Sequence, residues 1–187
     1  MSTEIKEALI KALKDPDEMV RVNSAKSLDL LDAKKNMQEL VDMYKSDKKE
    51  LKVKALCAFG KINDPSAKSC LIHALKSEEG EDVQATALRS LGKLKDPNTL
   101  QAVIDMLKSS SPTIKIVALE TLMEYNDKRL IPIFLKLLKF KDDLLVERAI
   151  VAIGEYEEPE TAKEFVPLLN HSNPKIRAAA AEALGKL

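Results

Sequence analysis

The chain has 187 residues, and its two histidines are of a type that could support chemistry. An imidazole can bind a metal ion or transfer a proton near neutral pH. His73 and His171 lie far apart in the sequence, and neither has the neighbouring Glu that paired His-Glu metal motifs require. We therefore interpret both as surface or capping histidines, and we expect no metal site.

The cysteines and glycines lead to the same expectation. Cys57 and Cys70 are too few for a disulfide framework or a zinc site, and we interpret both as inert thiols. A set of glycines recurs after large apolar residues, without the preceding strand or the spacing of a phosphate-binding loop. We interpret these glycines as close-packing or helix-ending residues, and we expect no catalytic residue and no cofactor.

The regular spacing of these glycines belongs to a repeat that governs the whole chain. Six similar segments follow one another after 31, 32, 31, 31 and 31 residues, and they begin at Val20, Leu51, Val83, Ile114, Leu145 and Ile176. Each has a small residue four positions later, and four of them carry a glycine further on, namely Gly60, Gly92, Gly154 and Gly185. A fixed period of this length is typical of a solenoid.

Each period contains two helical stripes of apolar residues. Val83, Ala87 and Leu91 follow the spacing of a buried helix face, which we name helix B. Leu100 and Val103 belong to a second stripe, helix A of the next copy. Side-chain caps and prolines precede both kinds of helix, as in Asp64-Pro65, Asp96-Pro97, Glu158-Pro159, Ser111-Pro112 and Asn173-Pro174.

These signals predict six helix pairs. The expected helices are 3–14 with 17–31, 34–45 with 49–62, 65–76 with 80–94, 97–108 with 112–125, 128–139 with 143–156, and 159–170 with 174–187. We expect Pro132 and Pro167 to kink their A helices without breaking the period. The unbroken repeat predicts one elongated domain, 1–187, with units at about 1–31, 32–62, 63–94, 95–125, 126–156 and 157–187.

Two stretches carry a resemblance to a known family. The run from Ile176 to Leu187, and the looser run from Val83 to Pro97, resemble the short HEAT repeats that also occur in phycobilin lyase subunits. The resemblance implies an all-α, right-handed α-α superhelix, with A helices on the convex side and B helices on the concave, partner-binding side. Such repeats serve scaffolds, lyase subunits, hydroxylases and DNA repair enzymes alike, so the fold alone does not identify the function.

The composition limits the classes of partner that we expect. The chain has 30 Lys and Arg residues and 30 Asp and Glu residues, so no overall field attracts nucleic acid or an anionic membrane. Aromatic residues make up only 4%, and those at repeat positions (Tyr44, Phe59, Tyr125, Phe134, Tyr156 and Phe165) are expected in the core. Phe140, in a loop, either packs over the core, which we favour, or is a small exposed contact residue. The first residues show no apolar leader and no membrane span, and we expect a cytoplasmic protein.

Charge patterning is the feature that bears on function. Three positions of each B helix are expected to face outward on the concave side, namely Lys54, Cys57 and Lys61, then Thr86, Arg89 and Lys93, then Val117, Glu120 and Glu124, then Arg148, Val151 and Glu155. The groove would be basic toward its N-terminal half and mostly acidic beyond it. Two interpretations stay open at this point, a solvated helix face and a binding groove.

Two functional hypotheses follow. The first is a non-catalytic scaffold that holds a protein or peptide in this groove, around exposed Val117 and Val151. The alternative is a non-autonomous subunit of a bilin-lyase-like enzyme, which would need an apolar cavity with convergent polar groups. Glu120, Glu124 and Glu155 argue against DNA. We also expect that Leu184 and Leu187 offer a homodimer contact through the C-terminal repeat.

Overall fold

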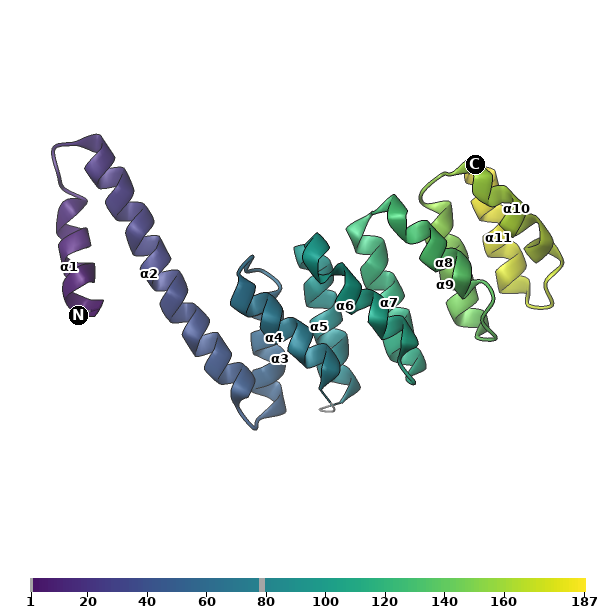
Figure 1. Ribbon diagram of the computed structural model, residues 1–187, viewed down its shortest axis with the longest axis horizontal. Coiled ribbons are helices and arrows are strands. Elements are labelled where there is room, and N and C mark those ends of the chain that lie inside the picture. Colours follow the sequence, from purple (N-terminus) through teal and green to yellow (C-terminus); the bar gives the residue numbers. More distant parts are fainter. Residues whose placement is uncertain (1, 78–79) are drawn as a thin grey trace. The chain divides into compact units, whose positions relative to one another are not determined.

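The computed structural model describes residues 2–77 and 80–187, and every secondary-structure element within them is helical (Figure 1). The chain falls into two compact units, Met1–Ala58 and Phe59–Leu187. The first contains α1 (Ser2–Ala12), α2 (Glu18–Lys45) and all but the last residue of α3 (Lys49–Phe59). The second contains the remaining helices.

In the first unit, α1 packs against α2. The Asp17 side chain caps α2 by accepting hydrogen bonds from the backbone N–H groups of Met19 and Val20. Lys6 Nζ donates to Asp32 Oδ1 over 2.7 Å and joins the two helices. Several apolar side chains of this hairpin remain in solvent, among them Ile5 at 46% and Met19 at 64% exposure. The first hairpin is therefore less completely packed than the repeats of the second unit.

One boundary differs from the prediction. Helices were expected at 17–31 and 34–45, but α2 runs continuously from Glu18 to Lys45. The sequence from Asp32 to Asn36 contains neither proline nor glycine, whereas the A helices that begin after Asp64, Asp96 and Glu158 each start with proline. Without a proline or glycine that stops the first helix, backbone hydrogen bonding continues through the expected turn.

The second unit consists of helix pairs in the predicted order. Its B helices are α5 (Glu81–Leu94), α7 (Pro112–Tyr125), α9 (Asp143–Gly154) and α11 (Pro174–Lys186). They form one row in which α5 contacts α7, α7 contacts α9, and α9 contacts α11. The A helices α4 (Pro65–Lys76), α6 (Leu100–Asp105), α8 (Ile131–Leu137) and α10 (Ala162–Phe165) pack on the B helices that follow them (Figure 1). The all-helical repeat fold predicted from the period is confirmed.

Short 3-10 turns extend three of these A helices. They are η1 (Pro97–Thr99) and η2 (Met106–Lys108) around α6, η3 (Lys128–Leu130) before α8, and η4 (Pro159–Thr161) and η5 (Val166–Asn170) around α10. Pro132 lies in the first turn of α8, and Pro167 lies in η5. Each proline lacks the N–H that a continuous α-helix would use, so the predicted kinks take the form of 3-10 segments.

The caps are largely as predicted. Side chains of Asp64, Asp96, Ser111, Asp142 and Asn173 accept hydrogen bonds from the first backbone N–H groups of their helices. Glu158 is the exception. It stands at the N-cap position, but its carboxylate accepts a hydrogen bond from Lys128 Nζ instead.

The core follows the repeat. Leu88, Leu91, Leu119 and Leu122 of the B helices are fully buried, as is Phe134 of α8. The other predicted core aromatics are buried too (Tyr44, Phe59, Tyr156 and Phe165), and Tyr125 is half-buried. The Phe140 side chain is 45% exposed in the loop before α9. The favoured prediction that it packs over the core is therefore wrong.

Candidate functional site

The predicted charged positions lie in solvent along one side of the B helices, which we call the B-helix face. In the second unit it carries the exposed side chains of Arg89 and Lys93 on α5, Glu120 and Glu124 on α7, and Arg148 on α9. Glu155 directly after α9 and Lys61 after α3 are exposed as well. Lys54 is exposed on the part of α3 that belongs to the first unit.

The two predicted apolar contacts need correction. Val117 is only 5% exposed, and it contributes to the lining of a hollow together with Arg89 and Glu120. Val151 on α9 is half-buried. The apolar surface on this face is therefore recessed between charged residues.

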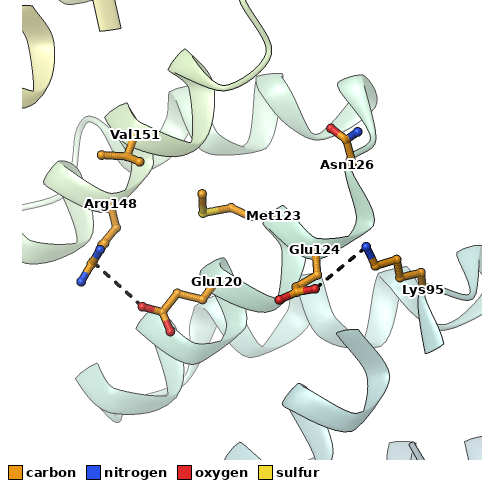
Figure 2. A pocket seen from close by; sticks show the side chains of 7 residues that line it. All are labelled: Lys95, Glu120, Met123, Glu124, Asn126, Arg148 and Val151. Carbon is orange, nitrogen blue, oxygen red and sulfur yellow. Dashed lines mark ion pairs between the residues drawn. The ribbon is translucent and has the colours of Figure 1, made fainter. Parts of the chain in front are cut away.

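Ion pairs between neighbouring repeats hold the acidic residues. Glu124 lies 4.0 Å from Lys95 Nζ, and Glu120 lies 4.0 Å from Arg148 Nε (Figure 2). Glu155 accepts a hydrogen bond from Lys186 Nζ over 2.6 Å. The Glu155 carboxylate, and after it that of Glu182, raises the pKa of Lys186. The expected acidic half of the groove is thus balanced by cations from adjacent helices.

The basic end has no such balance. Within residues 2–77 and 80–187, Lys61, Arg89 and Lys93 have no ion-pair partner. All three belong to the second unit and are exposed. The charge that this face leaves available for a partner is therefore positive, and it lies at the α5 end.

Three shallow hollows lie along the B-helix face. The first, of about 430 Å³, is lined by Lys95, Glu120, Met123, Glu124, Asn126, Arg148 and Val151 (Figure 2). A second of about 230 Å³ is lined by Arg89, Gly92, Lys93, Val117, Glu120, Thr121 and Glu124. A third of about 440 Å³ is lined by Met123, Asn126, Val151, Ala152, Glu155 and Tyr156. The hollows share residues and so form a continuous strip across α5, α7 and α9.

Sequence reasoning missed three residues that line the first hollow. Lys95 and Asn126 follow α5 and α7 with φ of 49° each, a left-handed conformation that ends the helix and that Asn adopts readily. Met123 stands on α7 where Gly92 stands on α5. The signal for Met123 was present in the repeat, because it replaces a glycine that the neighbouring copies carry.

Among the residues first considered for chemistry, His171 has a structural role. His171 Nδ1 accepts a hydrogen bond from the Asn173 backbone N–H at the start of α11, as expected of a capping histidine. Cys57 is exposed and Cys70 is half-buried, and the two do not form a disulfide with each other. Among the described residues, no three or more His, Cys, Asp and Glu side chains form a group that could hold a metal ion. Over the same residues, each helix is either too short or too polar to cross a membrane.

Paired glycines show how closely these repeats pack. A Cβ built on Gly60 would lie 2.8 Å from Ser90 Cβ, and one on Gly154 would lie 3.0 Å from Ala183 Cβ. The first distance is too short for a real side-chain contact and the second is unusually tight, so the glycines permit backbones of successive repeats to approach. The close-packing role predicted for these glycines is confirmed, whereas Gly185 has open space around it.

Comparison with solved structures gives similarity in fold. The chain is similar to the complex of CpcE and CpcF of phycocyanin lyase from Nostoc sp. PCC7120, with a TM-score of 0.62 and 24% identity, covering 81% of this chain and 64% of that chain. It therefore spans just under two thirds of that chain's length. It is also similar to the protein YibA of Escherichia coli, with a TM-score of 0.64 and 18% identity, covering 98% of this chain and 72% of that one.

A third similar structure is a designed armadillo repeat protein in complex with the peptide (KR)4, with a TM-score of 0.51 and 16% identity, covering 98% and 99% of the two chains. No curated protein matches the sequence. A family model for HEAT repeats matches residues 37–123, 71–149 and 141–187, which is most of the chain. This protein belongs to the HEAT repeat family.

Proposed function

We propose that this chain is a non-catalytic interaction module that holds a protein or peptide segment on its B-helix face. The observation that carries the proposal is the continuous strip of three hollows across α5, α7 and α9, lined by the charged residues that the repeat pattern picked out. Recessed apolar side chains surrounded by exposed charges are the usual composition of a surface that binds a polypeptide.

The fold supports a polypeptide partner. The designed armadillo repeat protein that this chain resembles in fold holds a peptide. A solenoid offers such a partner a row of equivalent positions, one per repeat, along which an extended segment can be held. The B-helix face has one such charged row, because Lys93 on α5, Glu124 on α7 and Glu155 directly after α9 occupy equivalent positions.

A bilin-lyase-like subunit is the second candidate, and the chemistry of the hollows favours it less. A tetrapyrrole site is expected to be a deep, mainly apolar cavity with a few convergent polar groups. The hollows of the B-helix face are shallow, and Lys, Arg and Glu side chains form their rims. Release of a covalently modified product by the purified chain would establish the enzymatic alternative.

Affinity purification with the full chain as bait, from the cell in which it is native, tests the proposal. A bait with Arg89→Glu and Lys93→Glu should lose its partner, because both charges lie in the strip and neither has an ion-pair partner among the described residues. Circular dichroism should remain unchanged, because exposed charges contribute little to stability. The matched control is Lys136→Glu, which reverses an exposed lysine on α8 outside the three hollows.

Two results would oppose the assignment. A partner that binds the doubly reversed bait as well as the original does not use the α5 end of the B-helix face. A partner lost from the Lys136→Glu bait instead places the interaction on the A-helix side. Lys68 is a poor control on that side, because it forms an ion pair with Asp96 and its reversal would disturb the packing of two repeats.

A further inference from the structure

Within the second unit, contacts between successive repeats follow a rule with one exception. A glycine late in one repeat lies against a small residue of the next, as Gly60 lies against Ser90, Gly92 against Thr121, and Gly154 against Ala183. At the contact between α7 and α9 the equivalent residue is Met123, and Ala152 stands opposite on α9. Met123 and Ala152 line the same hollow of about 440 Å³.

Methionine at this position prevents the close packing that glycine allows between neighbouring repeats. A Cβ on Gly92 would already lie 3.2 Å from Thr121 Cγ2, a tight contact, so a longer side chain fits at such a position only where the surrounding packing differs. Met123 therefore cannot repeat the glycine packing, and its half-buried side chain lies in the hollow between the two ion pairs, on the side toward Val151 (Figure 2). A flexible thioether beside a recessed valine is an adaptable apolar surface for another side chain.

The ion pairs beside Met123 are of a kind that a partner can rearrange. Lys95 with Glu124 and Arg148 with Glu120 are each at 4.0 Å, and all four side chains are about half exposed. Exposed pairs at such distances contribute little to stability. The two ion pairs nevertheless occupy the carboxylates of Glu120 and Glu124. These carboxylates do not attract a basic partner unless Lys95 or Arg148 is displaced.

Positive charge without a described ion-pair partner lies next to the hollow that contains Met123. The second hollow shares Glu120 and Glu124 with the first and is bordered on its other side by Arg89 and Lys93. These two cations have no ion-pair partner in the part of the chain that the structure describes. An acidic group can pair with them without breaking any contact within the protein.

We propose that the B-helix face binds an acidic peptide segment that carries one large apolar side chain. The apolar side chain packs on Met123 and Val151, and the acidic side chains pair with Arg89 and Lys93. The inference rests on the proposed function, which it deepens by stating the chemistry of the partner. The designed armadillo protein similar in fold holds a peptide of alternating Lys and Arg, whereas the free charge here selects the opposite sign.

Selection from a random peptide library on the immobilised full chain tests the sign of the charge and the apolar requirement together. Enriched peptides should be acidic with a recurring large apolar residue. Fluorescence anisotropy of a labelled enriched peptide should then show affinity that falls with added salt. Counterparts with Lys in place of the acidic residues, or with Ser in place of the apolar residue, should bind about tenfold or more weakly.

Variants of the protein separate this inference from the proposed function. Met123→Ala should weaken the enriched peptide by about tenfold, because it removes the apolar surface between α7 and α9. The matched control Met106→Ala truncates an equally half-buried methionine in η2, on the A-helix side, and should leave affinity unchanged. Arg89→Glu combined with Lys93→Glu should abolish the salt-dependent part of binding.

Enrichment of basic peptides, or an affinity equally affected by Met123→Ala and Met106→Ala, overturns the inference. Sensitivity to the Arg89 and Lys93 variants would in that case leave the proposed function standing. Peptides that are indifferent to every B-helix variant, or a selection that enriches no sequence, overturn both.

Discussion

The hydroxyl groups of Thr99 and Tyr125 are 2.7 Å apart and share a hydrogen bond between η1 and the last residue of α7. One repeat later, Tyr156 packs on Phe134 with ring centroids 6.3 Å apart. Its hydroxyl is buried and has no hydrogen-bond partner among the described residues, because Leu130 stands where Thr99 stands in the preceding repeat. The Asp127 backbone lies near this hydroxyl but does not complete a hydrogen bond.

These two tyrosines should respond differently to the same substitution. Tyr125→Phe removes a hydrogen bond and should lower the free energy of unfolding by about 1 kcal/mol. Tyr156→Phe removes a buried hydroxyl without a partner and should leave stability unchanged or raise it slightly. Urea unfolding of both variants measures the difference. Equal losses would mean that the Tyr156 hydroxyl is satisfied in solution.

The helix faces can be tested in the same way. Leu91 on α5 is fully buried, and Leu91→Ala should cost about 2 to 5 kcal/mol of unfolding free energy, because it leaves a cavity in the core. Lys93, two residues later, is exposed, and Lys93→Ala should stay within about 0.5 kcal/mol. Similar losses at both positions would contradict the assignment of the B-helix face.

Glycines at equivalent positions give a third prediction. Gly60→Ala would place a methyl group 2.9 Å from the Ser90 Cα, so a backbone must move, at a cost of about 1 to 3 kcal/mol. Gly185→Ala meets no atom within 4 Å and lies in α11, so it should stabilise the protein by up to about 1 kcal/mol. Thermal unfolding of the two variants should therefore shift in opposite directions.

The helix pairs were predictable because most repeats contain capping residues and prolines that mark where their helices begin. Asp64-Pro65 and Ser111-Pro112 place an acceptor and a proline where the helices begin, and the structure has α4 and α7 starting at those prolines. The junction at residues 31–34 lacks such signals, and there the period alone led to a wrong boundary. Periodicity locates the apolar faces, but a helix ends only where local residues stop it.

The charged residues of the candidate site were predictable in position but not in pairing. Repeat spacing placed Glu120 and Arg148 on one face, and both are exposed there. Their ion pair depends on the offset between α7 and α9, which a pattern within single helices does not contain. The prediction that Val117 is exposed was wrong for a related reason, because the burial of a helix position depends on how neighbouring helices pack, which the repeat spacing does not contain.

Continuity of α2 has a direct consequence for hydrogen exchange. Backbone N–H groups of residues 32–37 should be protected to the same degree as those of the adjoining turns, because they bond within one helix. Lys34→Pro introduces the residue with which α4 begins, and in a continuous helix it should cost about 3 kcal/mol of local stability. Unprotected N–H groups at 32–37, or tolerance of Lys34→Pro without loss of protection, would indicate two separate helices.

Acid should weaken one link between repeats in a defined pH range. Lys68 on α4 forms an ion pair with Asp96 at the start of η1. The hydrogen bond from Lys68, and after it the backbone N–H of Asn98, holds the pKa of Asp96 below its ordinary value of 3.8. A carboxyl whose pKa is lower in the folded state contributes stability above its unfolded pKa, and that contribution disappears as the pH falls through the folded pKa.

The variant Lys68→Gln isolates this contribution. It should be less stable than the original protein at neutral pH, and the difference should stay constant down to about pH 4 and shrink below it, once Asp96 becomes protonated in both proteins. Urea unfolding of both proteins across this range measures the difference. Lys136→Gln, which changes an exposed lysine of α8, serves as the control and should show no such pH dependence. A gap between Lys68→Gln and the original protein that persists or widens in strong acid would mean that Lys68 acts through packing of its methylene chain and not through the Asp96 carboxylate.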